Sequence, residues 1–304
     1  MSNTLLATLL VASTLLLTAC SAAGSPGSAV PGASASPVGG APTPAATSLA
    51  IDHARGAADV ILRMSTGGGF MAPGFTVTEA PEFTLYGDGT VILRDPRAEP
   101  RPVSTDGVNR LLPFRTGHLS EGQVQALLAF ALDQGGLGTA LAEYPPHGIM
   151  DAPSTTFTIA AGGLVKSVNV GALGFDQTQP DPNAAARKAF VALADRLTAF
   201  AHDGMLTTTL YQPTAYRGFL AEDGAQVPTG GTIAWPWSAF GPEAFIASTS
   251  GSGPAIPSRT LSAATVAALG LPNLEGGASG IILRGKDGKP YSLSLRPLLP
   301  DEGP

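Results

Sequence analysis

The residues of this chain that could do chemistry are carboxylates scattered along an acidic body and two tryptophans around one proline. Asp88, Asp151, Asp176 and Glu222 could act as acid and base in the hydrolysis of cell-wall or polysaccharide material. Their spacing does not group them, so such a site would have to assemble in three dimensions. This hydrolase remains the alternative to a non-enzymatic binding function.

The tryptophans Trp235 and Trp237 flank Pro236. On a strand their side chains share one face with Ile233, and the proline suits only an edge strand or an irregular segment. One interpretation is an exposed aromatic platform that stacks on a sugar or grips a protein partner. The other is a pair of core residues, which we favour because tryptophan is largely buried on average.

Other motifs with chemical meaning lack the context that they need. Residues 67–72 fit the spacing of a dinucleotide fingerprint, but Pro73-Gly74 prevents a helix from following, so a loop between strands is expected. Residues 280–286 fit a phosphate-loop spacing, but Asp287 stands where a Ser or Thr is needed. The four histidines are far apart, and no Gly-x-Ser-x-Gly or Ser-x-x-Lys occurs. The sequence therefore predicts no catalytic residue, no metal site and no cofactor.

An apolar run near the N-terminus ends in Leu17-Thr-Ala-Cys20, and Cys20 is the single cysteine. This stretch resembles the lipobox of bacterial lipoproteins. The resemblance implies that residues 1–19 are a signal peptide and that Cys20 carries diacylglycerol and a fatty acid such as palmitate, which anchors the protein to a membrane outside the cytoplasm. No charged side chain occurs before Asp52, so the basic start of a signal peptide is missing. A cysteine that merely follows a leucine-rich membrane or core segment is the alternative.

Residues 20–50 are predicted to form a disordered tether. Positions 21–48 hold only Ser, Ala, Gly, Pro, Thr and two Val. Such a segment buries too little apolar surface to offset the entropy lost on ordering.

The remaining body is long enough for one large or two ordinary domains. The net charge of the chain is −6 and no Lys/Arg cluster occurs, which argues against nucleic-acid partners. Without a second cysteine the body has no internal disulfide and must rely on its core. We expect an α+β domain at residues 51–205 and a smaller α+β domain at residues 206–304.

The first domain is expected to contain two hairpins and two helices. The expected elements are a strand at 60–64, a hairpin of 83–86 and 90–94 around Asp88-Gly89, a helix starting at Ser120 with Gln123 completing a capping box, a hairpin of 154–160 and 164–170, and a helix with Asp181 as N-cap and Pro182 at its first position. Residues 95–118 are expected to form a loop.

The last hundred residues repeat this pattern faintly. The expected elements are a hairpin around Asp223-Gly224, a helix at 262–269 and a hairpin of 280–284 and 291–296. The stretches 119–127 and 261–269 are identical at five of nine positions. This indicates two related hairpin-helix-hairpin units, unless both helices simply share common capping and apolar residues.

The body also carries four stretches by which it resembles a group of bacterial secreted lipoproteins: residues 85–92, the helix start at 119–120, residues 151–157 and residues 296–302. The resemblance implies a fold and a location but no activity. The predicted fold is thus α+β, with antiparallel hairpin sheets each packed by one or two helices. The predicted function is that of a lipid-anchored envelope protein that binds a protein or glycan partner.

Overall fold

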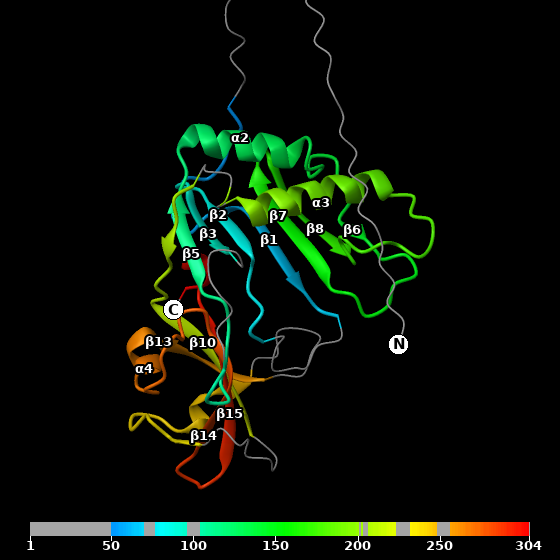
Figure 1. Ribbon diagram of the computed structural model, residues 1–304. Coiled ribbons are helices and arrows are strands. Elements are labelled where there is room, and N and C mark those ends of the chain that lie inside the picture. Colours follow the sequence, from blue (N-terminus) through cyan, green and yellow to red (C-terminus); the bar gives the residue numbers. More distant parts are fainter. Residues whose placement is uncertain are drawn as a thin grey trace, which may run out of the picture. The chain divides into compact units, whose positions relative to one another are not determined.

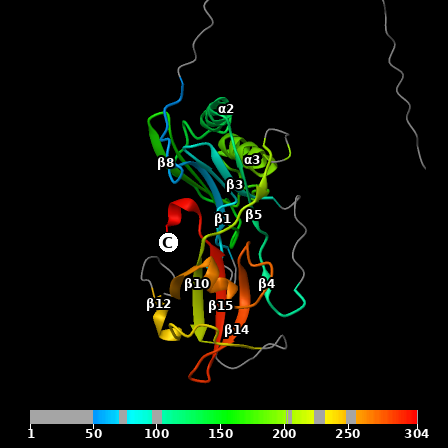
Figure 2. The same ribbon diagram turned by 90° about the vertical axis from the view of Figure 1, so that its left-hand side faces the viewer.

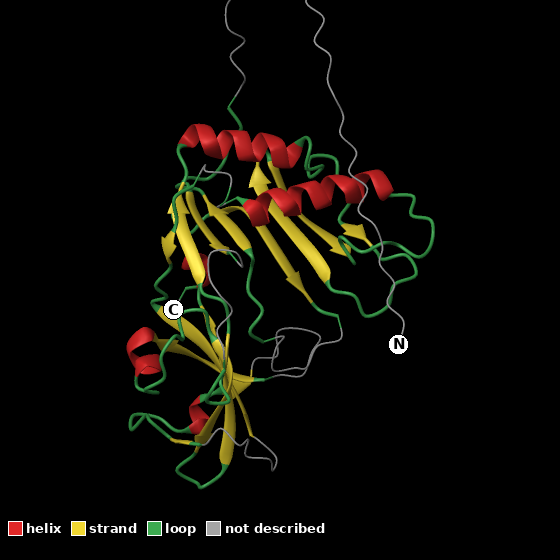
Figure 3. Ribbon diagram, in the orientation of Figure 1, coloured by secondary structure: helices red, strands yellow, loops and turns green. Residues whose placement is uncertain are grey.

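The computed structural model describes residues 50–69, 77–95, 104–200, 202, 206–222, 232–247 and 256–303. As predicted, they form an α+β fold of two mainly antiparallel sheets with helices packed against them (Figures 1 and 3). Residues 49–304 belong to one compact unit. The signal peptide, Cys20 and nearly all of the predicted tether lie outside the described residues.

The large sheet has the strand order β6-β8-β7-β1-β2-β3-β5-β9, and only its β6–β8 pair is parallel. Two helices, α2 (Glu121–Leu132) and α3 (Ala184–Ala199), cover one face of it (Figure 2). The strands are β1 (Val60–Gly67), β2 (Phe83–Tyr86), β3 (Thr90–Arg94), β5 (Phe114–His118), β6 (Glu143–Tyr144), β7 (Ser154–Ala161), β8 (Leu164–Gly171) and β9 (Thr209–Leu210).

Alternation along the strands decides which face the helices cover. In β7, Thr155, Phe157, Ile159 and Ala161 are buried while the residues between them are half-exposed. Because side chains alternate across a strand, the buried set faces the helices and the other set faces away. The core between sheet and helices includes Leu62, Met64, Phe83, Leu85, Leu127, Leu128, Phe157, Val168, Phe190, Leu193 and Leu197.

The small sheet has the strand order β11-β14-β15-β10-β13-β12, and β4 pairs with β14. Its strands are β4 (Asn109–Arg110), β10 (Ala215–Glu222), β11 (Ile233–Ala234), β12 (Ile246–Ala247), β13 (Pro257–Ser262), β14 (Ala278–Arg284) and β15 (Pro290–Pro297). The short helix α4 (Ala263–Ala267) packs against β13 and β10, and two 3₁₀ turns are η1 (Pro242–Ala244) and η2 (Pro300–Glu302). A separate core fills this part, with Trp237, Leu261, Ile281, Leu283, Leu293 and Leu295 among its residues.

Most locally encoded elements are confirmed. Both hairpins of the first part form as predicted, and so does the β14–β15 hairpin. The α2 helix starts after Ser120, whose backbone N–H donates to Gln123 Oε1 over 2.9 Å. The α4 helix starts after Ser262, whose hydroxyl accepts from the Thr265 N–H over 3.1 Å.

Two predicted elements are wrong, and a third lies mostly outside the described residues. The stretch 95–118 was expected to be a loop but contains β4 and β5. The turn and second strand of the predicted hairpin around Asp223-Gly224 lie outside the described residues; its first strand is part of β10, where Phe219 pairs with Ser258 on one side and Ser294 on the other.

The second correction concerns the start of α3. The helix begins at Ala184 with Asn183 as N-cap, two residues later than predicted. The Asp181 carboxylate instead accepts from the Asn183 N–H over 2.7 Å and forms an ion pair with buried Arg187 over 2.5 Å. This buried partner draws Asp181 into a turn before the helix.

Each of the two sheets contains a strand from the other side of the predicted boundary at 205/206. β4 comes from the first part of the chain and joins the small sheet, whereas β9 comes from the second part and joins the large sheet. A small core of Ala80, Tyr86, Ile92, Phe114 and Leu299 also draws on both parts. Among the described residues, no helix is long and apolar enough to cross a membrane.

Candidate functional site

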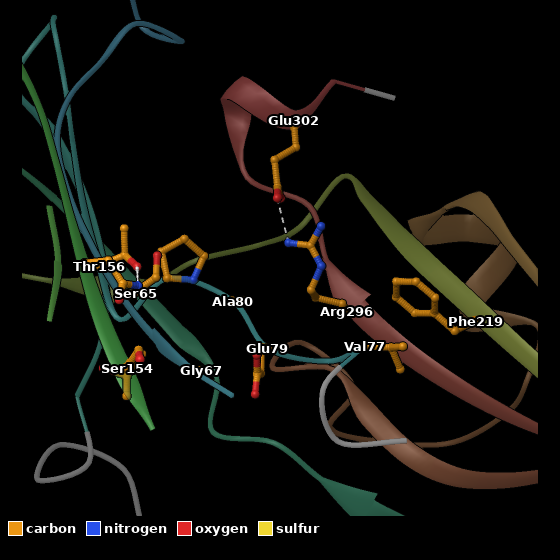
Figure 4. A pocket seen from close by; sticks show the side chains of 13 residues that line it. Ser65, Gly67, Val77, Glu79, Ala80, Ser154, Thr156, Phe219, Arg296 and Glu302 are labelled. Atoms are coloured by element: carbon orange, nitrogen blue, oxygen red, sulfur yellow. Dashed lines mark hydrogen bonds and ion pairs between the residues drawn. The ribbon is translucent and has the colours of Figure 1, made fainter. Parts of the chain in front are cut away.

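A pocket of about 610 Å³ is lined by residues of both sheets. Figure 4 shows strands of the large sheet on one side of it and strands of the small sheet on the other. The lining residues are Ser65, Thr66, Gly67, Val77, Glu79, Ala80, Pro81, Ser154, Thr156, Asn169, Phe219, Arg296 and Glu302. We call this the inter-sheet pocket.

The wall formed by the large sheet is a row of uncharged polar side chains. Thr156 lies on the face of β7 that the helices leave open, and it pairs with Ser65 on β1 and with Asn169 on β8. The Asn169 amide donates to the Thr156 hydroxyl over 3.1 Å. Since neighbouring strands lie about 4.8 Å apart, this row presents two hydroxyls and an amide side by side.

Glu79 is the carboxylate of the segment that precedes β2. Its Oε1 accepts from the Gly68 N–H over 3.3 Å. Burial raises the pKa of Glu79 above its ordinary value, and the hydrogen bond from Gly68 only partly offsets this. A hydrogen-bond donor of a ligand placed against this carboxyl group would offset part of the cost of its burial.

The wall formed by the small sheet contributes Phe219 and Arg296. On β10, Tyr216, Gly218 and Leu220 are buried in the core, so Phe219 faces the other way. It is half-buried, and among the described residues its ring takes part in no aromatic or cation–π contact. Its ring is the one aromatic surface among the described residues that line the pocket.

Arg296 lies on the same face of the small sheet, and its Nη1 donates to Glu302 Oε1 over 2.6 Å. Figure 4 shows Glu302 directed at the guanidinium group, with the Glu79 carboxylate pointing away from it. The pocket thus combines one ion pair, one further carboxyl group, one aromatic ring and a row of hydroxyl and amide groups.

The C-terminal turn η2 ties the two walls together. Asp301 accepts hydrogen bonds from Arg63 on β1 and from the Tyr86 hydroxyl on β2, each over 2.7 Å. Leu299 is buried in the small core between the sheets. Glu302 follows directly, so the part of the turn that lines the pocket is held by the residues before it.

The predicted tryptophan pair lies outside this pocket. Trp237 is buried and its Nε1 donates to Thr265 O over 2.8 Å; half-buried Trp235 donates to Phe240 O over 2.8 Å. Trp235 makes edge contacts with four aromatic rings: Trp237, Phe240, Phe245 and Tyr291. These contacts favour the core interpretation of the pair over the platform.

A second pocket of about 640 Å³ adjoins this cluster and is lined by residues 238–243, Lys286, Asp287 and Tyr291. Its aromatic groups are already engaged. Trp237 stacks on Phe240 with ring centroids 5.0 Å apart, and the Arg259 guanidinium lies 4.5 Å from the same ring. The ring of Phe240 therefore already has two partners. The Tyr291 hydroxyl donates to Asp287 over 2.7 Å.

The four carboxylates considered for hydrolysis are not part of the inter-sheet pocket. Asp88 accepts from the Thr90 N–H within its own turn, and exposed Glu222 pairs with Lys289. Asp151 has a positive φ of 56°, and Asp176 is exposed. Among the described residues, no group of three His, Cys, Asp or Glu is arranged to hold a metal ion.

Sequence reasoning missed Glu79, Phe219, Arg296 and Glu302 as a group. A weak signal existed for Phe219 and Arg296, since each stands out of phase with the large apolar residues of its strand. Such a residue lies on the face that its own core leaves open. Nothing local indicates that these faces border one pocket. The chain matches no protein-family model, no curated protein and no solved structure.

Proposed function

We propose that this chain is a lipid-anchored protein outside the cytoplasm that binds a hydroxyl-rich ligand of the saccharide type in the inter-sheet pocket. The observation that carries the proposal is the composition of the pocket wall: the row of Ser65, Thr156 and Asn169 opposite the ring of Phe219.

The chemistry of the wall matches that of a sugar. A saccharide offers hydroxyl groups at its edges and C–H groups on its faces. Hydroxyl and amide side chains both donate and accept hydrogen bonds, so they can satisfy sugar hydroxyls of either orientation. An aromatic ring supplies an apolar surface for the C–H face. The pocket is also within the range of volumes, about 300–1,000 Å³, that small-molecule sites occupy.

Support for the anchor comes from the sequence. The stretch ending at Cys20 resembles a lipobox, and the segment after it has the composition of a flexible tether. Two acyl attachments would give stable membrane binding, whereas one chain alone gives only marginal binding.

The second candidate is a hydrolase, favoured by a specific observation. Two carboxylates, Glu79 and Glu302, line the same pocket in different environments: burial raises the pKa of Glu79, while Glu302 forms an ion pair with Arg296. Pairs of carboxyl groups with divergent environments perform acid–base catalysis in glycosidases. Against this, Glu302 is engaged by Arg296 and Glu79 points away from it (Figure 4).

Ligand binding is tested by calorimetric titration with soluble di- to tetrasaccharides. Thr156→Val and Phe219→Ala should each weaken binding about tenfold, the cost of one lost hydrogen bond or apolar contact. Thr158→Val is the matched control, because Thr158 lies on the same face of β7 but does not line the pocket.

The outcomes separate the candidates. Absence of binding to every saccharide, or equal losses for Thr158→Val and Thr156→Val, would refute the pocket as the site. Cleavage of a bound saccharide that stops in Glu79→Gln while binding persists would establish the hydrolase instead.

The anchor is tested by Cys20→Ser. The variant should leave the membrane fraction after a high-salt wash, since no basic patch of the body can replace acyl chains. Continued sedimentation of the variant with membranes would refute the lipid anchor.

A further inference from the structure

Arg296 is the one cationic side chain among the described residues that line the inter-sheet pocket. On β15, Leu293, Leu295 and Pro297 are buried in the core of the small sheet, and Arg296 projects from the opposite face. Its side chain is 15% exposed, so it is accessible but largely removed from bulk water. A charge in this position interacts with a ligand more strongly than a surface charge does.

The guanidinium group of Arg296 is only partly used by its internal partner. Its Nη1 donates to Glu302 Oε1, but Glu302 Oε2 accepts from the Leu299 N–H over 2.8 Å. Because Glu302 divides its two oxygens between a side chain and the backbone, it holds Arg296 at one point. Arginine carries five N–H donors, and its usual pairing with a carboxylate is two-pronged.

Resting on the function proposed above, we propose that Arg296 binds a carboxylate of the ligand through the donors that Glu302 leaves unused, so that the ligand is an acidic saccharide. The hydroxyls of such a ligand lie against Ser65, Thr156 and Asn169, and its carboxylate lies at Arg296.

A carboxylate fits this position better than a phosphate does. The planar guanidinium edge matches two oxygens of either a carboxylate or a phosphate, so the charge of the ligand decides between them. A phosphate monoester carries up to two negative charges and would enter a pocket that already contains Glu79 and Glu302. Like charges a few ångströms apart in a partly buried site oppose each other strongly.

The test compares two trisaccharides that differ in one group: a uronic-acid trisaccharide and the same trisaccharide with its carboxylates reduced to alcohols. Titration of the wild-type protein should give at least about tenfold tighter binding of the acidic form, the value of a charge-assisted hydrogen bond. Arg296→Gln should bring the ratio of the two affinities to about one or below it, because Glu79 and Glu302 then oppose the acidic form without a cation to offset them. Glu302→Gln should raise the ratio, because it removes a competing negative charge.

Two further variants serve as controls for the effect of Arg296→Gln. Arg296→Lys keeps the charge but loses the two-pronged geometry, so it should retain only part of the preference for the acidic trisaccharide. It replaces Arg296→Gln in the test if that variant does not fold. Arg284→Gln makes the same change of charge at an exposed position of β14 outside the pocket and should leave the ratio unchanged.

The possible results distinguish the role of Arg296 from the proposed function itself. Equal binding of the two trisaccharides by the wild-type protein would overturn the role of Arg296 while leaving saccharide binding intact. Tighter binding of a sulfated or phosphorylated analogue than of the uronic-acid form would overturn the choice of carboxylate. Binding of none of these sugars would refute the proposed function itself.

Discussion

Buried polar contacts at single residues hold the C-terminal turn in place. Asp301 is the centre of one such contact, with Arg63 and the fully buried Tyr86 as its donors. Burial acts to raise the pKa of Asp301, but the hydrogen bonds from Arg63 and Tyr86 outweigh it, and the pKa is lowered. The pKa of Tyr86 shifts in the opposite direction: burial and the hydrogen bond to the Asp301 carboxylate both raise it.

We predict that Asp301 contributes to the loss of stability in acid. A carboxyl group whose folded-state pKa is depressed stabilises the protein above its unfolded pKa of about 3.9, and this stabilisation is lost as the pH falls through the folded value. Asp301→Asn should lower the free energy of unfolding at pH 7 by about 2 kcal/mol and flatten its fall below about pH 5.

Urea unfolding across pH 2–7 measures this effect. Asp195→Asn, an exposed substitution on α3, is the control. Parallel pH profiles for Asp301→Asn and wild type would contradict the assignment.

Trp237 gives a second prediction at this scale. Trp237 is 5% exposed and its ring stacks on Phe240, so Trp237→Ala should lower the free energy of unfolding by about 3–5 kcal/mol. Ile246→Ala, at a side chain that is 73% exposed, should change it by less than about 0.5 kcal/mol. Thermal melting compares the two. An unchanged melting temperature for Trp237→Ala would revive the platform interpretation.

At the scale of single elements, the turn between β2 and β3 combines two requirements at one glycine. Gly89 has a φ of 92°, and a Cβ atom there would lie 2.5 Å from Leu119 O. Asp88 supports the turn by accepting from the Thr90 N–H over 2.8 Å. Glycine, which has no Cβ atom, adopts this positive φ without strain and leaves room for the Leu119 carbonyl oxygen just before α2.

Gly89→Ala and Gly68→Ala separate these two requirements. Both positions have positive φ, but a Cβ atom added at Gly68 would meet no neighbouring atom within 4 Å. Gly68→Ala should therefore cost only the backbone strain, about 1 kcal/mol, and Gly89→Ala at least about 1 kcal/mol more. Thermal unfolding of both variants checks the order. Equal melting temperatures would mean that the contact with Leu119 relaxes without cost.

At the scale of the whole molecule, the two sheets depend on each other's segments. Tyr86 and Phe114 of the large sheet are fully buried, and Leu299 from the end of the chain packs against them. β9, which closes the β5 edge of the large sheet, also comes after residue 205. Residues after the predicted boundary at 205/206 therefore cover part of the sheet that lies before it.

We predict that the fragment 49–205 unfolds at a lower temperature than the body 49–304, because it exposes Tyr86 and Phe114 and leaves the edge of β5 unpaired. Thermal unfolding followed by circular dichroism measures the difference. The body without residues 1–48 should melt like the full chain. A fragment that melts as cooperatively and as high as the body would establish two independent domains.

The sequence by itself determined those elements whose signals are local. Asp88-Gly89, the Ser120–Gln123 cap and the apolar periodicity of α2 act within a few residues, so the hairpin and the helix follow from them. The composition of residues 21–48 predicts a tether, and the resemblance of residues 17–20 to a lipobox implies an anchor; both stay predictions.

Tertiary structure alone decided the elements and sites that depend on distant partners. The stretch Phe114–His118 has one large apolar residue and becomes a strand because β3 and β9 pair with it. Asp181 leaves its expected cap because Arg187 is buried beside it. The inter-sheet pocket joins Ser65 on the first strand to Glu302 in the last turn. Such a site exists only after the strands have paired and the C-terminal turn has docked. The sequence around any one of its residues therefore does not indicate which other residues line the pocket.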